Sequence, residues 1–251
     1  MLSIKTAFNK FYGQILTQYG FHKIKGMPCF GRLINNEIFQ YIMPKTVSTL
    51  IKGKKAFTII SGMFSIYSHI PCYDRIDFEN MGQNFISFCN VNDTVKDRFN
   101  ELYQFHYDDS DIHLMLEKTF FEFQNIMLPY LDSVQNIKDY VQYLKDFQPG
   151  RLRFADNMKN EGIILVKIND HDDFMKYYQQ MCDTMLKHFD NNPNNPHYIE
   201  SINLYHNTFV NEIACSRDNI YNSAELYEQA MNELEKRKEK NISFLKANGF
   251  I

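Results

Sequence analysis

The spacing of apolar residues changes along the chain, and this change restricts the fold class. From Ser3 to Tyr19, apolar residues recur every three or four positions, which is the spacing of one helix face. From Phe21 to about Ser68 the pattern changes to short runs rich in Ile, Phe, Tyr and Thr, typical of strands. After Asn92 the helical spacing returns. The sequence therefore predicts an α+β fold, with an N-terminal helix and an antiparallel β-sheet followed by a mostly α-helical C-terminal region.

Turn residues divide the strand-like region into separate strands. These turns are Gly26-Met27-Pro28, Asn35-Asn36 and Lys52-Gly53-Lys54. The best hairpin joins Cys29–Ile34 to Glu37–Met43, because the intervening asparagines tolerate the positive φ of a tight turn. Lys55–Tyr67 is predicted to be a long central strand that is apolar on both faces, so the sheet should be covered on both sides. Another strand is expected near residues 85–91.

Helices are predicted after these strands. The first begins at Asp93 and runs through Phe105, and the second begins at Asp111 and is stopped by Pro129. A third covers Asn136–Phe147 and ends before Pro149-Gly150. This dipeptide is the predicted boundary between an α+β domain of residues 1–150 and a helical region of residues 151–251 packed on it.

The C-terminal region contains one ambiguous segment. Ile163–Ile168 fits either a buried strand or the end of a helix. A helix follows over Phe174–Phe189, and Leu165–Tyr178 resembles the inter-helix turn of one tetratricopeptide hairpin. The segment Asn191–Pro196 is predicted to interrupt the helical structure before the last two helices. The basic residues of Lys236–Lys240 follow several glutamates, and we interpret them as a solvated helix end.

Composition excludes several classes of protein. Hydrophobic residues make up 44% and charged residues 23% of the 251 residues, which excludes wholesale disorder. A net charge of −3 disfavours general nucleic-acid binding. The five cysteines form neither a disulfide framework nor a CxxC pair, as expected for reduced thiols in a cytosol. The longest aliphatic run, Ile163–Val166, is too short to span a membrane, so a cytoplasmic location is predicted.

The N-terminal part resembles an uncharacterised bacterial domain family. The segments that carry the resemblance are Tyr19-Gly20-Phe21-His22-Lys23, Phe30-Gly31-Arg32, Phe39-Gln40-Tyr41, Ala56-Phe57-Thr58-Ile59 and Phe64-Ser65-Ile66-Tyr67. They match a helix with a Gly-Phe step, an arginine-bearing strand and an aromatic strand, over about residues 1–130. The resemblance implies an α+β fold and no assigned activity.

The densest polar cluster in the sequence has two interpretations. His106, Asp108, Asp109 and His113 offer imidazole and carboxylate groups that suit Zn²⁺ or Mn²⁺. Their spacing matches no known metal motif, however, and the aspartates, with Asp111, are typical of the cap and first turn of a helix. We therefore predict capping and no metal site. Asp170-His171-Asp172-Asp173 is interpreted in the same way.

Two arginines are candidate ligand-binding residues. Arg32 lies in a predicted strand, where its guanidinium offers fixed donors for a carboxylate or phosphate, although pairing across the hairpin to Glu37 is the expected alternative. Arg75 lies in a loop with Cys72, which suggests a nucleophile and base or merely an idle thiol. Arg151 and Arg153 are expected to hold the two regions together.

These observations favour a non-enzymatic binding or regulatory protein of the bacterial cytoplasm. Serine-hydrolase, P-loop and Rossmann motifs are missing from the sequence, whereas aromatic strands and helical hairpins offer broad surfaces for a protein partner. No cofactor is expected, and the oligomeric state is left open. A specific form of this hypothesis, by analogy alone, is an immunity or defence-associated protein. The alternative is a metal-dependent hydrolase or nuclease that uses His106, Asp108, Asp109 and His113.

Overall fold

The structure of the chain is a computed structural model. It describes residues 3–68, 105–108, 110–147, 164, 167–168, 179, 182–201, 223–247, 249 and 251. Two compact units divide the chain. Unit 1 comprises Met1–Ser65, Cys72–Asn136 and Ser243–Ile251, and unit 2 comprises Ile66–Pro71 and Ile137–Ile242. The predicted boundary at Pro149-Gly150 lies outside the described residues, so the division into residues 1–150 and 151–251 stays a prediction.

Unit 1 begins with the predicted helix. Helix α1 covers Ile4–Leu16, and a 3-10 turn, η1, follows over Thr17–Tyr19. The side chain of Ser3 accepts a hydrogen bond from the Thr6 N–H at 3.2 Å and so caps the first turn. Gly20 ends the helical segment with a φ of 77°, a left-handed conformation that glycine adopts without strain. Both predicted ends of this helix are therefore confirmed.

The described residues of unit 1 also form a five-stranded antiparallel sheet with the order β1-β2-β3-β4-β5. The strands are β1 (His22–Lys23), β2 (Phe30–Ile34), β3 (Ile38–Val47), β4 (Lys55–Ser65) and β5 (Phe105–Tyr107). Asn35 and Asn36 join β2 to β3 with φ angles of 49° and 56°, as the hairpin prediction requires. The α+β class is thus confirmed. Phe105 was predicted to end a helix and instead begins the edge strand β5, because it pairs with Phe57.

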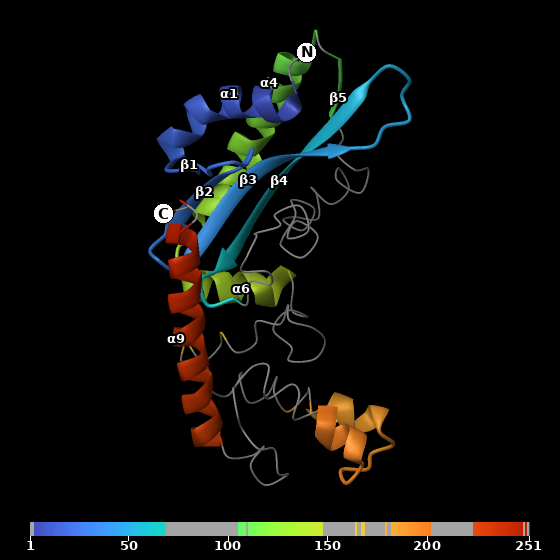
Figure 1. The fold of residues 1–251 in the computed structure, drawn as a ribbon, viewed down its shortest axis with the longest axis vertical. Helices are drawn as coiled ribbons and strands as arrows, with labels where there is room; N and C mark the ends of the chain where they lie inside the picture. Colours follow the sequence, from blue (N-terminus) through green and yellow to red (C-terminus); the bar gives the residue numbers. More distant parts are fainter. Residues whose placement is uncertain are drawn as a thin grey trace. The chain divides into compact units, whose positions relative to one another are not determined.

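Both faces of the sheet are buried, as predicted. Helix α1 lies against one face of the sheet (Figure 1). On this face the ring of Phe8 is 5.8 Å from the ring of Phe30. On the opposite face, Tyr41 is paired with Gly31 on one side and Gly62 on the other. The ring of Tyr41 lies so close to Gly62 that a Cβ added there would be 2.6 Å from its hydroxyl oxygen. Glycine is required at this position because the backbone and the ring approach each other closely.

The helical segment after β5 passes through Pro129. Helix α4 covers Ile112–Glu122, the π-helical turn η3 covers Phe123–Met127, and α5 covers Leu128–Asp132. The prediction that Pro129 stops this helix is therefore wrong. Proline lacks an N–H and clashes with the carbonyl four residues earlier in an α-helix, and the wider π turn just before it relieves that clash.

Unit 2 contains helix α6 (Ile137–Phe147), as predicted, and most of α9 (Ser223–Ala247). Ile164, Lys167 and Ile168 adopt 3-10 helical conformation and not that of a strand. The basic run Lys236–Lys240 lies within α9, which continues to Ala247, so its interpretation as a helix end is wrong. Arg237 is buried and donates from Nε to Glu233 at 3.0 Å. Within the described residues, no helix combines the length and apolar content that crossing a bilayer requires.

Candidate functional site

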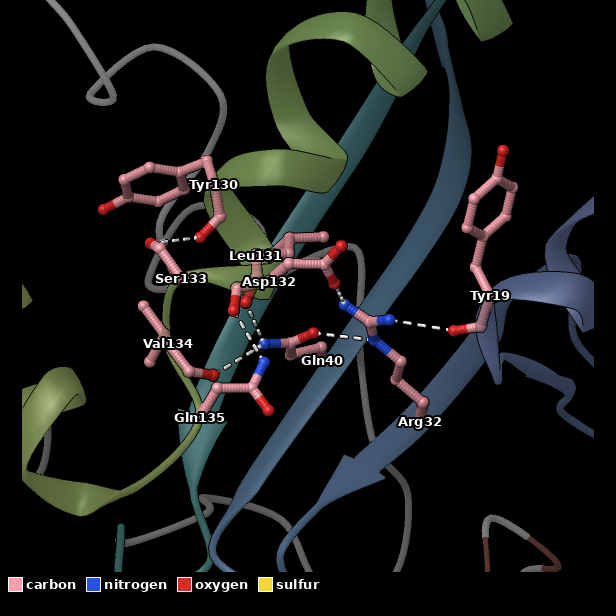
Figure 2. Close-up of polar contacts among 9 residues, drawn as sticks. All are labelled: Tyr19, Arg32, Gln40, Tyr130, Leu131, Asp132, Ser133, Val134 and Gln135. Carbon is pink, nitrogen blue, oxygen red and sulfur yellow. Dashed lines mark hydrogen bonds and ion pairs between the residues drawn. The ribbon is translucent and has the colours of Figure 1, made fainter.

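Arg32, the first candidate residue, lies in a buried network within unit 1 (Figure 2). Its Nε donates to Gln40 Oε1 at 2.8 Å, and its Nη1 donates to the carbonyl oxygen of Tyr19 at 2.8 Å. Its Nη2 forms an ion pair with Asp132 Oδ1 at 2.5 Å. The guanidinium also lies over the ring of Phe21, 4.4 Å from its centroid. Every nitrogen of the guanidinium thus has a partner inside the fold.

Gln40 extends this network to the helical segment. Its Nε2 donates to the carbonyl oxygens of Leu131 at 2.7 Å and Val134 at 3.2 Å, which lie at the end of α5 and just beyond it (Figure 2). The expected pairing of Arg32 with Glu37 is wrong, because Arg32 lies opposite Gln40 on the face that meets α5. Ligand binding by Arg32 stays a prediction.

The histidine and aspartate cluster does not converge around one point in the described residues. His106 lies on β5, where its Nδ1 is 2.9 Å from the hydroxyl of Thr49. His113 lies in the first turn of α4 and is exposed. Asp109 lies outside the described residues. Among the residues that the structure does describe, no three His, Cys, Asp or Glu side chains gather as metal ligands.

The two described aspartates of this cluster surround a lysine. Lys54 Nζ lies 2.6 Å from Asp108 Oδ2 and 3.3 Å from Asp111 Oδ2. The hydrogen bond from Lys54 holds the pKa of Asp108 well below its usual range, and bonds from Ser110 act in the same direction. The same hydrogen bond raises the pKa of Lys54. The ammonium group of Lys54 therefore provides a positive counter-charge to both carboxylates.

The capping prediction is right about position and wrong about the bonds. Asp111 is the N-cap residue of α4, but its side chain caps no N–H of that helix. Its Oδ1 accepts instead from the backbone N–H of Asp108 at 2.7 Å, and Asp108 Oδ1 accepts from the Ser110 N–H at 2.9 Å. The carboxylates therefore fix the turn between β5 and α4, and with Lys54 they attach that turn to the β3–β4 hairpin.

This hairpin ends in an exposed apolar tip, which we define as residues Ser48–Gly53. Leu50 is fully exposed, and Ile51 retains 51% of its accessible surface. The loop projects from one end of the sheet (Figure 1). Large aliphatic side chains are mostly buried in folded proteins, so Leu50 and Ile51 form an exposed apolar pair at this turn. Sequence reasoning treated this segment only as a turn.

The tip is held in place by several bonds from its own residues and from β5. The Ile51 N–H donates to Thr49 Oγ1 at 3.1 Å, and the same hydroxyl is the one that meets His106. The Lys54 N–H donates to the Ile51 carbonyl oxygen at 3.2 Å, and Gly53 takes a φ of 78° in this turn. The side chain of Lys54 is held in turn by Asp108 and Asp111. These contacts connect the turn to β5 and to the segment that follows β5.

Comparison with known proteins provides no template for this site. The chain matches no family model, no curated protein and no solved structure. The resemblance to an uncharacterised bacterial domain family stays a prediction. Other candidate residues lie outside the described part of the chain, namely Cys72, Arg75, Arg151, Arg153 and the segment Asp170–Asp173. The site is interpreted from its own residues.

Proposed function

We propose that this chain is a non-enzymatic binding protein that contacts a protein partner through the apolar tip. The observation that carries the proposal is the exposure of Leu50 and Ile51 on an ordered turn. Complete burial of each side chain contributes about 1.5–3 kcal/mol. Association itself costs several kcal/mol, so the tip serves as the central anchor of a larger contact that includes neighbouring residues.

The order of the tip supports this role. A loop that is already fixed loses less conformational freedom on binding than a loop that must become ordered. The bonds made by Thr49 and Lys54 fix the loop in this way. His106, which contacts Thr49, and Asp108, which pairs with Lys54, therefore have a structural role in this proposal.

The proposal places the protein in the bacterial cytoplasm, in a regulatory role of the immunity or defence-associated kind. This refinement is supported only by composition and analogy. The alternative, a metal-dependent hydrolase or nuclease using His106, Asp108, Asp109 and His113, stays a prediction. Of its two carboxylates, Asp108 already forms an ion pair with Lys54, and Asp109 lies outside the described residues.

Site-specific crosslinking in the native host tests the binding function. A photoreactive amino acid replaces Leu50 in one variant and Ile199 in a matched control, since Ile199 is also exposed at 41%. We expect a protein that crosslinks from Leu50 and not from Ile199, identified by mass spectrometry and then purified. Its affinity for the Leu50→Asp/Ile51→Asp variant should fall at least about tenfold, because two anchors are lost. Ile199→Asp should leave the affinity unchanged.

The opposite results would contradict the proposal. Equal crosslinking from Leu50 and Ile199 would mean that the captured protein contacts the chain non-specifically. An affinity that survives the double substitution would mean that the partner binds elsewhere. Circular dichroism of each variant checks that the exposed substitutions leave the fold intact.

A further inference from the structure

We infer that the partner presents acidic groups around an apolar pocket that receives Leu50 and Ile51. This inference rests on the proposed function. It starts from the charge of the hairpin, because no Asp or Glu lies between Glu37 and Asp74, whereas Lys45, Lys52, Lys54 and Lys55 lie in that span. The whole chain carries a net charge of −3, so this basic hairpin contrasts with the rest of the sequence.

The described carboxylates that contact this hairpin both lie at its Lys54 end and not at Lys52. Asp108 and Asp111 are both engaged by Lys54, which lies at the base of the turn. Lys52 follows Ile51 directly, is exposed, and forms no ion pair within the described residues. A positive charge is therefore presented beside the apolar pair. Charge complementarity across an interface calls for a carboxylate at this point of the partner.

The composition of the tip argues against the two other common acidic targets. Ser48–Gly53 contains no aromatic residue and no arginine, so it lacks the stacking groups and forked donors typical of nucleic-acid recognition. A lipid surface is recognised by clusters of about 4–8 Lys or Arg, and of the four lysines of this hairpin Lys54 is bound by Asp108 and Asp111, which leaves three. A protein surface, which combines one pocket with a few placed carboxylates, fits better.

Selection of peptides provides a defined probe. A phage-displayed library of random peptides is selected on the full-length chain and counter-selected on Leu50→Asp/Ile51→Asp. We expect the enriched peptides to place Asp or Glu beside large apolar residues. Their affinity for the chain, measured by fluorescence anisotropy, should fall about tenfold with Lys52→Glu, since attraction becomes repulsion. It should also fall several-fold between about 50 mM and about 300 mM NaCl.

A matched control separates this local effect from a change in net charge. Lys118 is exposed on α4, and Lys118→Glu changes the net charge by the same amount as Lys52→Glu. We expect Lys118→Glu to leave the peptide affinity within about twofold, because screening limits its reach. Equal losses from both variants would overturn the inference.

The outcomes distinguish failure of the inference from failure of the proposed function. Two results would overturn the inference of an acidic partner and leave the binding function intact. One is enriched peptides that require Leu50 and Ile51 but contain no acidic residues. The other is peptides whose affinity changes neither with Lys52→Glu nor with salt. Enrichment of no peptide that depends on the tip would also overturn the inference. Tip-dependent sedimentation with phosphatidylcholine vesicles containing about 30% phosphatidylserine would replace the protein partner with a membrane. The crosslinking experiment, in contrast, tests the function itself.

Discussion

Arg32 on β2 and Asp132 at the end of α5 form an ion pair at 2.5 Å across 100 positions of sequence. The Arg32 side chain is 9% exposed and that of Asp132 is 50% exposed, so one end of the contact is buried and the other meets water. Within unit 1, the pair attaches the end of the helical segment to the sheet, and Gln40 adds two further bonds to the same segment. The network therefore fixes one end of the helical layer on the sheet.

Replacement of Arg32 should destabilise unit 1. Arg32→Met removes the donors to Gln40, Tyr19 and Asp132, and it leaves the buried Gln40 Oε1 without its partner. We expect a loss of about 3 kcal/mol in the free energy of unfolding, measured with urea. Arg32→Lys should recover only part of it, because an ammonium group cannot reproduce the three-way fork. A loss below about 1 kcal/mol for Arg32→Met would show that the network does not stabilise the fold.

A buried hydroxyl pair between α1 and α4 provides a second prediction. Tyr12 donates to Thr119 Oγ1 at 2.8 Å, and Thr119 donates onward to the Leu116 carbonyl oxygen at 2.8 Å. Burial raises the pKa of Tyr12, so the phenol stays protonated and able to donate. Thr119→Val should cost about 1–3 kcal/mol, because it leaves the Tyr12 hydroxyl buried without an acceptor. Adding Tyr12→Phe should recover part of that loss, whereas additive losses would contradict coupling between the two hydroxyls.

The features that sequence reasoning predicted correctly depend on neighbouring residues. Ser3 and Gly20 define the ends of α1 through bonds within a few positions. Asn35 and Asn36 define the hairpin through their own backbone angles. In each case the controlling interaction is local, so its signal is contained in a short stretch of sequence.

The features that were missed depend on distant residues. Arg32 meets Asp132 and not Glu37 because the helical segment returns to the sheet, which spacing within the hairpin cannot reveal. Pro129 is predicted to end its helix because the neighbouring residues give no sequence signal for the π turn that precedes it. The cluster around Asp108 was interpreted as a cap, although its main partner, Lys54, comes from another hairpin. The tip matches no sequence motif. The features that could have indicated it are two adjacent aliphatic residues beside a turn, in a segment without Asp or Glu.

The contact between Gly62 and Tyr41 provides a third prediction. A Cβ at Gly62 would lie 2.6 Å from the hydroxyl oxygen and 2.7 Å from Cζ of Tyr41. Gly62→Ala should therefore destabilise the protein by about 1–3 kcal/mol, because a buried ring must move. The matched control is Ser61→Ala in the same strand, because the buried Ser61 hydroxyl has no hydrogen-bond partner among the described residues. That change should be neutral or stabilising, and thermal unfolding of both variants measures the contrast.

The pair of Lys54 and Asp108 predicts a dependence of stability on pH. The pKa of Asp108 is lowered in the folded state, chiefly by the hydrogen bond from Lys54. The contribution of this carboxylate is therefore fully present above its ordinary pKa of about 3.9 and is lost as the pH falls toward the lowered folded value. Lys54→Met should be less stable than the native chain near pH 7, by a small amount because both groups meet solvent.

Urea midpoints of the native chain and Lys54→Met at several pH values test this prediction. The difference between the two midpoints should be constant from about pH 5 to about pH 9 and should shrink below about pH 4, where Asp108 begins to bind a proton in the unfolded chain. It should shrink again in strong base, since the pKa of Lys54 is raised and its contribution is lost only above the folded value. Lys118→Met, an exposed control on α4, should show no such profile. A difference that persists unchanged at about pH 2 would mean that Lys54 stabilises the hairpin through its aliphatic stem and not through the aspartates.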